Sequence, residues 1–570
     1  MALRTVHSRP VEPGPPRPPA LLAVAVLIGI ALARIILTYG VLSHTYDEPA
    51  HIAAGMELLV TRTYEYENLH PPFARMMTAL LPWIDGARFD HGPGMYDEGI
   101  ALLYGRGSYD RELTMARLGV LPFFALGAVI LWVWARNIYG DLAAFFALVL
   151  YTNAPVPLAH AGVATTDTIF TTFFIATLFA WTRWLSSPTT ARALLFGLAA
   201  GLAIVSKFSA LIYFPACAAA LEIRRWRAGE RLPPPAVIAR SFAAATAVVL
   251  IVLWGAYGAH TFRITTKEDR PHTAFDEKFS LPGPLRSVAY AMLETPIPYA
   301  PELRNGLSTL EQKNTRGHYS YLLGEIKTSA DWRFFPTGLL FKSPLPFLAL
   351  AFTGAVLALR PGARRRAWRR GAPHLFAGVI LALGMASNVN IGLRHVLPIY
   401  PLLAIVGGSG AATLWRSARR PEVTRGLVCL LLLWLVIGSA RGHPDYLAYF
   451  NELAGSHPER ILVNSDLDWG QDLHRLRDLC RTRGIEELTI AYFGRTDLTK
   501  HGLAATVHEL EPDTPAAGWV AISLCSLKSR GGGGYRWLEE YEPVARAGNT
   551  ILLYRFDELT GPGAEGSAAR

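Results

Sequence analysis

Long apolar segments recur along this chain and constrain its fold more than any other feature. A membrane-spanning helix needs about 20 mostly apolar residues. Segments of about this length cover residues 20–42, 114–135, 141–158, 166–185, 192–206, 208–223, 236–259, 338–359, 373–387, 396–415 and 425–441. Two of them, 192–206 and 373–387, are short, so either is a candidate for a re-entrant or broken helix. The sequence therefore predicts an all-α polytopic membrane protein with about eleven transmembrane helices.

The composition agrees with this prediction. Only 18% of the residues are charged and 51% are hydrophobic, whereas a soluble protein has about 25% charged residues. The net charge of +10 comes from short basic runs between the apolar segments. Such runs set membrane topology, so the positive charge does not indicate nucleic-acid binding.

The placement of arginine predicts the orientation of the helices, because cytoplasmic loops are enriched in basic residues. We place residues 1–19, a Pro- and Arg-rich tail predicted to be disordered, in the cytoplasm. Every short basic run then falls on the cytoplasmic side: Arg136; Arg183 and Arg192; Arg224, Arg225, Arg227 and Arg231; Arg360, Arg364, Arg365, Arg366, Arg369 and Arg370; and Arg416, Arg419, Arg420 and Arg425. A membrane domain of residues 20–441 results, with outer loops 43–112 and 260–337 and an extracytoplasmic tail 442–570.

The tail 442–570 is predicted to be a small α/β domain. The pattern predicts a helix over 471–480 and strands over 461–463, 488–493, 519–524 and 551–556. Outside the cytoplasm, its two cysteines, Cys480 and Cys525, could form a disulfide. The sequence leaves this pairing open.

Two adjacent acids, Asp47 and Glu48, follow the first apolar segment by a few residues. Carboxylates at a membrane boundary are costly to bury, which makes them candidates for function. A carboxylate accepts a proton from a hydroxyl or binds a metal ion. The alternative is a solvated loop in which one acid caps the next helix. Helical spacing over residues 50–60 is compatible with a helix along the membrane surface.

Two further polar positions occur near the predicted outer ends of helices. His70 precedes Pro71 and Pro72 and could contact a phosphate or a sugar hydroxyl, although the segment could also be only a rigid turn. Asp167 begins the fourth apolar segment, where it could cap the helix, serve a site, or do both.

Three cations, Lys207, Lys342 and Arg394, also lie at outer helix ends. The positive-inside bias makes cations less expected there. A snorkelling lysine is the alternative explanation for Lys207. Three cations at one depth on separate helices indicate an anion, and lipid phosphates lie at this depth. No Walker motif, Rossmann fingerprint or Cys/His metal pattern occurs, which argues against ATP hydrolysis.

These motifs, taken in order, resemble the polytopic glycosyltransferases that use lipid-carrier donors. This group contains the protein O-mannosyltransferases and the aminoarabinose transferase of lipid A, and the chain is most similar to bacterial family 39-type members. The motifs are Tyr46-Asp47-Glu48, Leu69-His70-Pro71-Pro72-Phe73, Ser206-Lys207-Phe208, Tyr321-Leu322-Leu323-Gly324-Glu325, Trp332 to Pro336 followed by Lys342-Ser343-Pro344-Leu345-Pro346, Arg394-His395-Val396-Leu397-Pro398, and Asn464-Ser465-Asp466-Leu467-Asp468-Trp469-Gly470-Gln471-Asp472-Leu473.

The resemblance implies a GT-C fold in a bacterial inner membrane, with the site on the outer face. It implies that Asp47 is the catalytic base, with Glu48 beside it. The donor would be a polyprenyl-phosphate sugar. Its phosphate and sugar would be bound by His70, Asp167, Lys207, Lys342, Arg394 and His395. Glu48 and His70 would position groups or bind a divalent ion, and a single displacement would invert the anomeric centre.

Some expectations stay open at this point. Protein O-mannosyltransferases carry further external domains that are not visible here, which puts a protein acceptor in doubt. The sugar and the acceptor, a lipid glycan or a protein, are not specified by the sequence. The rival functions are a secondary transporter, which usually places its charges at the membrane midplane, and a non-catalytic membrane assembly subunit that uses its tail for partners.

Overall fold

A computed structural model describes residues 18–230, 232–262, 282–294, 297–298, 301–327, 329–358, 368–529 and 533–563. Of the tail 1–19 that is predicted to be disordered, residues 1–17 lie outside the described residues, whereas Pro18 and Pro19 belong to the first helix. Five basic residues that entered the orientation argument also lie outside the described residues: Arg231, Arg360, Arg364, Arg365 and Arg366.

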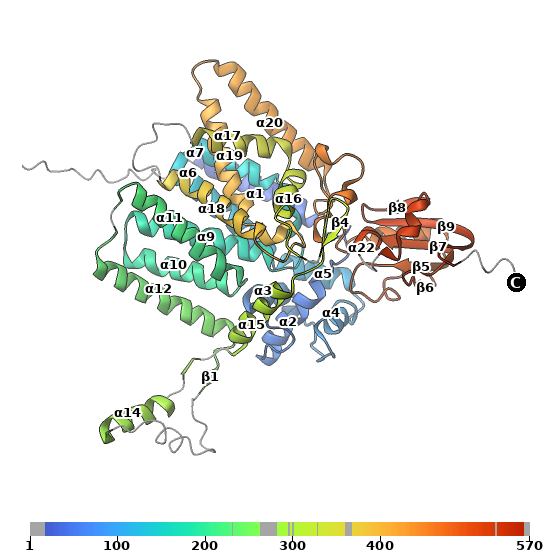
Figure 1. Cartoon of the computed structure of the whole chain (residues 1–570), viewed down its shortest axis with the longest axis horizontal. Coiled ribbons are helices and arrows are strands. Elements are labelled where there is room, and N and C mark those ends of the chain that lie inside the picture. Colours follow the sequence, from blue (N-terminus) through green and yellow to red (C-terminus); the bar gives the residue numbers. More distant parts are fainter. Residues whose placement is uncertain are drawn as a thin grey trace, which may run out of the picture.

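The described chain is mostly helical, with one mixed sheet near its C-terminal end (Figure 1). The first outer loop contains α2 (Glu48–Thr61), α3 (Pro72–Ile84), α4 (Met95–Tyr104) and the start of α5 (Tyr109–Leu118). The helices of the predicted membrane domain outside its two outer loops are α1 (Pro18–Ile36), α6 (Leu121–Tyr139), α7 (Asp141–Thr152), α8 (Pro155–Ala161), α9 (Asp167–Ser186), α10 (Thr190–Ile204), α11 (Ser209–Arg227), α12 (Pro235–Ala256), α16 (Phe334–Lys342), α17 (Leu345–Ala358), α18 (Trp368–Met385), α19 (Ile399–Trp415) and α20 (Pro421–Arg441).

The second outer loop contains short elements. They are β1 (Thr261–Phe262), α14 (Gly283–Glu294), β2 (Ile297–Pro298), α15 (Pro301–Arg316), β3 (Ser320–Leu322) and β4 (Glu325–Lys327). β1 pairs with β2 and β3 pairs with β4, both antiparallel. A short 3-10 helix, η1 (Leu393–Val396), leads into α19.

Each of the predicted apolar segments contains a helix. Within the described residues, five helices are long and apolar enough to cross a membrane, and two bent pairs raise this number to seven. The five are α1, α5 joined to α6, α9, α12 and α20; α10 and α19 are shorter apolar helices. The prediction of a mostly helical multi-pass membrane protein is confirmed, whereas the count of eleven spans stays a prediction.

The breaks occur in other segments than those predicted. α7 and α8 bend by 63°, and α16 and α17 by 117°, so residues 338–359 do not form one straight span. Pro155 and Pro344 stand at these breaks and cannot continue a preceding helix. Residues 192–206 instead form the unbroken α10. Gly197 allows its close contact with α12, since a Cβ there would lie 2.5 Å from the Ala245 carbonyl oxygen.

The helix expected over residues 50–60 is present as α2, but it does not lie exposed along a surface. Its residues from Glu48 to Leu58 are all buried, and α3 and α4 pack against it. A left-handed C-cap at Arg62, with φ of 60°, ends the helix. α2 is thus an internal helix. Glu48 is its first residue and Asp47 is its N-cap residue.

The C-terminal sheet has the strand order β6-β5-β7-β9-β8. Its strands are β5 (Glu487–Ala491), β6 (Thr506–Glu509), β7 (Ala516–Ser523), β8 (Ala545–Ala547) and β9 (Ile551–Thr560), with α21 (Leu473–Arg483) and α22 (Leu524–Ser529) beside them. β5 is parallel to β6 and β7, whereas β9 is antiparallel to β7 and β8. The predicted α/β character is confirmed. Cys480 and Cys525 are both buried and are not joined by a disulfide.

One predicted strand is wrong. Residues 461–463 are an apolar, buried run, but they lie between short 3-10 turns rather than in the sheet. They join the same hydrophobic core as the membrane helices, together with Leu447, Trp469 and Ile522 of the tail. The tail therefore packs directly on the helical domain through a shared core (Figure 1).

Candidate functional site

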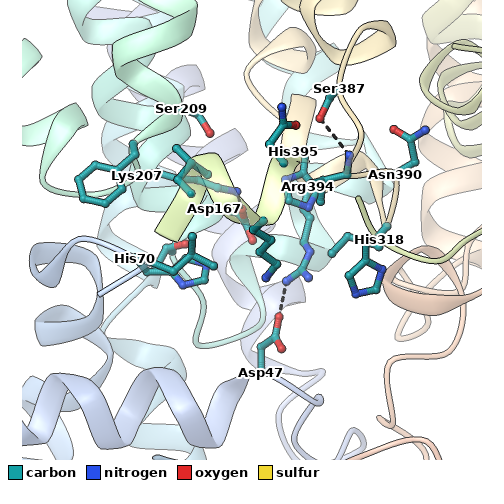
Figure 2. A pocket seen from close by; sticks show the side chains of 18 of the residues that line it. Asp47, His70, Asp167, Lys207, Ser209, His318, Ser387, Asn390, Arg394 and His395 are labelled. Atoms are coloured by element: carbon teal, nitrogen blue, oxygen red, sulfur yellow. Dashed lines mark hydrogen bonds and ion pairs between the residues drawn. The ribbon is translucent and has the colours of Figure 1, made fainter. Parts of the chain in front are cut away.

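A cavity of about 1020 Å³ lies where the first outer loop, the starts of α9, α11 and α19, helix α15 and the tail meet. Six of the predicted site residues line it: Asp47, His70, Asp167, Lys207, Arg394 and His395. Figure 2 shows these side chains around one space, with Arg394 near its centre and Asp47 below it. The structure thus brings together residues that are up to 348 positions apart in the chain, from 47 to 395.

Asp47 is the N-cap residue of α2, but its side chain makes no capping hydrogen bond. The carboxylate instead accepts a hydrogen bond from Arg394, with 2.5 Å between Nη1 and Oδ2. Burial by itself raises the pKa of the Asp47 carboxyl, but the charge and hydrogen bond of Arg394 outweigh burial and hold this pKa below its ordinary value. Asp47 is therefore ionised at neutral pH.

Asp167 and Lys207 form a second ion pair in the same cavity, with Nζ 2.6 Å from Oδ1. Asp167 is the first residue of α9, where the helix dipole also favours a carboxylate. Lys207 lies just before α11 begins. Arg75, Lys207, Lys313 and Arg394 all line the cavity, and Lys207 and Arg394 are each paired with one aspartate.

His70 belongs to a polar network on the cavity wall. Its Nδ1 lies 3.0 Å from Oε2 of Glu67, and Glu67 also pairs with the buried Arg75. Arg75 Nε donates to His51 Nδ1 over 3.1 Å. A guanidinium can only donate, so the proton of the neutral His51 ring is on Nε2. His51 follows Asp47 by four residues on α2, a helical spacing that could have identified it from the sequence.

His395 lines the cavity beside Arg394. Its backbone oxygen accepts a hydrogen bond from the Tyr213 hydroxyl over 3.1 Å. Within the described part of the chain, no group is within hydrogen-bonding distance of its buried Nε2 atom.

Glu48 does not face the cavity, in contrast to the prediction. It is fully buried and receives two hydrogen bonds from Arg117, 2.9 Å from Nε and 3.0 Å from Nη2. The backbone N–H groups of Thr45 and Ala164 donate to it as well, each over 2.7 Å. Burial by itself raises the pKa of the Glu48 carboxyl, but Arg117 and these amides outweigh burial. The net effect is a pKa below the ordinary value, so the group stays ionised. Glu48 holds the loop in place rather than a reactant.

Lys342 also lies outside the cavity lining. It stands at the break between α16 and α17, where its Nζ donates to the carbonyl oxygens of Leu447 over 2.7 Å and Asp466 over 2.5 Å. The Phe450 ring lies 4.3 Å from Nζ. Lys342 therefore fixes the start of the tail and is not placed to bind the same anion as Lys207 and Arg394.

The tail contributes to the cavity through residues that the sequence alone did not single out. Asn464, Trp469 and Phe493 line it. The three acids Asp466, Asp468 and Asp472 each accept a hydrogen bond from a distant segment, and Asp472, the N-cap residue of α21, makes no capping hydrogen bond with its side chain. Asp466 accepts from Leu393 N over 3.0 Å, Asp468 from Cys525 N over 2.8 Å, and Asp472 from Thr550 Oγ1 over 2.8 Å. Such long-range contacts leave no local pattern in a sequence.

The structure does not bring together Glu48 and His70, which the resemblance implies either position groups or bind a divalent ion. Glu48 faces Arg117, away from His70, and the described residues contain no group of three or more His, Cys, Asp or Glu side chains placed to bind a metal. We therefore assign no residue here to an ion.

Comparisons with known proteins concern the family and the fold of the chain. Residues 110–255 match the family model described as dolichyl-phosphate-mannose-protein mannosyltransferase. No curated protein matches the chain in sequence. Among solved structures, the chain is similar to the Saccharomyces cerevisiae protein O-mannosyltransferase Pmt1-Pmt2 complex bound to the sugar donor, with 12% identity and a TM-score of 0.51 over 75% of this chain and 90% of that chain.

Two further structures are similar over most of this chain. ArnT from Cupriavidus metallidurans, bound to undecaprenyl phosphate, has 14% identity and a TM-score of 0.48 over 93% of this chain and 97% of that chain. The Archaeoglobus fulgidus oligosaccharyltransferase has 14% identity and a TM-score of 0.46 over 86% and 64%. The family match and the fold shared with the yeast complex confirm the predicted resemblance to lipid-carrier-dependent glycosyltransferases.

The first prediction tests whether Glu48 stabilises the fold through its ion pair with Arg117. Breaking a buried ion pair leaves an uncompensated charge, so Arg117→Met should lower the free energy of unfolding by about 3–5 kcal/mol. Arg111→Met is the control, because the Arg111 side chain is 60% exposed, and it should change stability by about 0.5 kcal/mol or less. Unfolding in detergent by circular dichroism measures both. An Arg117→Met protein as stable as wild type would contradict this role for Glu48.

A buried histidine cluster between the first outer loop and the tail predicts a pH dependence. His44 Nδ1 lies 2.6 Å from the Tyr109 hydroxyl, and the rings of His474 and His501 stack with centroids 5.1 Å apart. Burial lowers the pKa of His44 and His474 to about 4 and that of His501 to about 3. The cluster is thus neutral when the tail is docked.

Unfolded histidines, with a pKa of about 6.5, bind protons that the docked ones do not. Stability from this cluster is therefore complete above about pH 6.5 and is lost as the pH falls towards about 4. We expect the unfolding midpoint to fall over this range, and His501→Gln to reduce the slope. Midpoints with the same pH slope in wild type and His501→Gln would show that the cluster does not couple docking to pH.

Proposed function

We propose that this protein transfers a sugar from a polyprenyl-phosphate carrier to an acceptor hydroxyl on the outer face of the membrane. The observation that carries the proposal is the cavity in which two carboxylates, Asp47 and Asp167, each hold one cation, Arg394 and Lys207. The cavity combines the two kinds of group that the transfer needs, a base and a pair of phosphate ligands.

The position of these groups on their helices supports the outer face. Asp167 begins α9, and Arg183 lies in its last turn. Lys207 precedes α11, whose last turn contains Arg224, Arg225 and Arg227. Arg394 likewise precedes α19, which ends next to Arg416. The site thus lies at the ends of helices opposite to their basic ends, and the basic ends are expected in the cytoplasm.

The phosphate of a lipid carrier would lie at the depth of Lys207 and Arg394. Arginine binds phosphate through two parallel hydrogen bonds, whereas lysine acts as a point charge. As the sugar leaves, the phosphodiester gains one negative charge on the departing oxygen. Both cations would then stabilise a charge that grows in the transition state. An arriving phosphate also competes with Asp47 for Arg394, which would release the carboxylate for its role as a base.

Asp47 would accept the proton of the acceptor hydroxyl. The acceptor oxygen attacks the anomeric carbon, the bond from that carbon to the phosphate oxygen breaks, and its electron pair stays on the phosphate. The products are the glycosylated acceptor, the polyprenyl phosphate and a protonated Asp47. One direct displacement of this kind inverts the anomeric configuration. Holding both reactants in one cavity supplies much of the acceleration.

The family description supports a polyprenyl-phosphate donor, because it names a dolichyl-phosphate-linked sugar. The yeast complex that shares the fold contains a sugar donor. The sugar and the acceptor of this chain are not fixed by these observations. The transporter hypothesis fits less well, since the paired charges lie at helix ends beside the tail rather than at a midplane between repeated halves.

Asp47→Asn tests the proposal. The amide keeps the shape of the side chain but cannot take a proton, so turnover should fall by about 100-fold or more, while folding and donor binding remain. The assay is sugar release from a panel of synthetic polyprenyl-phosphate sugars by the purified protein in lipid. Asp97→Asn, an exposed acid of the same outer loop, is the control and should behave as wild type.

Consumption of one donor by wild type but not by Asp47→Asn would support the function and identify the sugar. Near-normal turnover by Asp47→Asn would reject Asp47 as the base. Wild-type protein that neither consumes nor binds any donor in the panel would favour the transporter or the assembly subunit.

A further inference from the structure

We infer that Trp469 of the tail is a positioning residue that sets Arg394 and Asp47 relative to each other, so that the tail completes the active site. This inference rests on the proposed function. It assigns a role to a tail residue that neither binds the proton nor carries charge.

The first observation is the contact of Trp469 with Arg394. The guanidinium carbon of Arg394 lies 4.4 Å from the centre of the Trp469 ring. Trp469 is 1% exposed, so the contact is desolvated, which strengthens a cation–π interaction. Arg394 Nε is buried with no hydrogen-bond partner among the described residues. The face of the Trp469 ring and the Asp47 carboxylate are therefore the two groups that hold this guanidinium in place.

The second observation is that Trp469 also holds the segment that carries Asp47. Tyr46 N donates to Trp469 O over 2.8 Å, and Ser43 N donates to Gln471 O over 2.9 Å. These two bonds join residues 43–46 to residues 469–471 in the manner of paired strands. Asp47 follows this paired segment directly, so its position depends on the backbone of Trp469.

The loop around Trp469 is itself held by internal hydrogen bonds. Asp468 accepts from Gly470 N over 3.1 Å and from Cys525 N over 2.8 Å. Gln471 accepts from Trp469 N over 2.8 Å and donates to Leu467 O over 2.8 Å. Groups whose own hydrogen bonds are satisfied in this way form a rigid support for a neighbouring site.

The same loop also holds the backbone on the other side of the ion pair. Leu393 N donates to Asp466 Oδ1 over 3.0 Å, and Ser465 Oγ donates to Ile391 O over 2.6 Å. The approach at Gly392 is so close that a Cβ there would lie 2.0 Å from Ser465 Oγ. One loop of the tail thus contacts both the segment that carries Asp47 and the segment that carries Arg394. Trp469 of this loop contacts both segments.

The test compares Trp469→Leu and Trp469→Phe with wild type. We measure binding of a polyprenyl phosphate without sugar, and the pH profile of kcat/KM with the donor found for wild type. Loss of the ring should weaken phosphate binding by about tenfold. It should also move the acidic limb of the profile to higher pH, because a less well-held Arg394 lowers the pKa of Asp47 less. Trp469→Phe keeps an aromatic face and should recover part of both effects.

Trp134→Leu is the matched control. Trp134 is equally buried at 1% exposure and stacks on Phe179, and neither residue is among those that line the cavity. Its loss should reduce stability without changing phosphate binding or the pH profile.

The outcomes separate this inference from the proposed function. If wild type consumes a donor, and Trp469→Leu is destabilised but has wild-type phosphate affinity and pH profile, Trp469 is only structural and the inference is wrong while the function stands. If no donor is consumed by wild type, the proposed function fails first. A Trp469→Leu protein that does not fold is replaced by Trp469→Phe, for which an unchanged pH profile and affinity also count against the inference.

Discussion

The ion pair between Asp47 and Arg394 is the interaction on which the rest of this site depends. The Asp47 side chain is 22% exposed and that of Arg394 is 12% exposed, so each charge is partly shielded from water and is stabilised by the other. Because the two residues come from distant parts of the chain, their pairing fixes the first outer loop against the start of α19. The same pair keeps Asp47, the proposed base, ionised and keeps Arg394 at the place where a lipid phosphate is proposed to bind. The Asp47–Arg394 ion pair therefore both holds two distant segments together and keeps two charged groups in the cavity.

The tail is not a separate module, because it is hydrogen-bonded to the segments that precede Asp47 and Arg394. Its sheet has a small core of its own around α21 and β5, but Leu447, Leu467 and Trp469 belong to the core of the membrane helices. Backbone hydrogen bonds from residues 469–471 hold the segment before Asp47. A tail that docks in this way can couple its own stability, including the protonation of His44, His474 and His501, to the geometry of the site.

Much of the site could be predicted from the sequence, because cations and acids at the outer ends of apolar segments are unusual enough to stand out. Asp47, Asp167, Lys207 and Arg394 were found by this signal, and the cavity lining contains all of them. The roles of Glu48 and Lys342 could not be predicted. Asp47 and Glu48 are adjacent at the start of α2, but their side chains point in different directions. The prediction for Lys342 assumed a straight helix over residues 338–359, whereas the chain bends between α16 and α17.

The remaining errors also have physical causes. The run at 461–463 has the composition of a strand, but its apolar side chains are needed in the shared core rather than in a sheet. The strands β6 and β8 were missed since they are short edge strands without alternation of buried and exposed residues. The role of Trp469 does not stand out in the sequence, because its contacts with Tyr46 and Arg394 join parts of the chain that no local pattern connects.

The most direct test of the account is a structure of the protein in lipid with a bound polyprenyl phosphate. The account predicts phosphate density in the cavity, within hydrogen-bonding distance of Lys207 and Arg394 and beside Asp47. It also predicts that Arg394 still lies on the ring of Trp469. Phosphate density at the basic ends of α9 and α11, with the cavity unoccupied, would contradict the account.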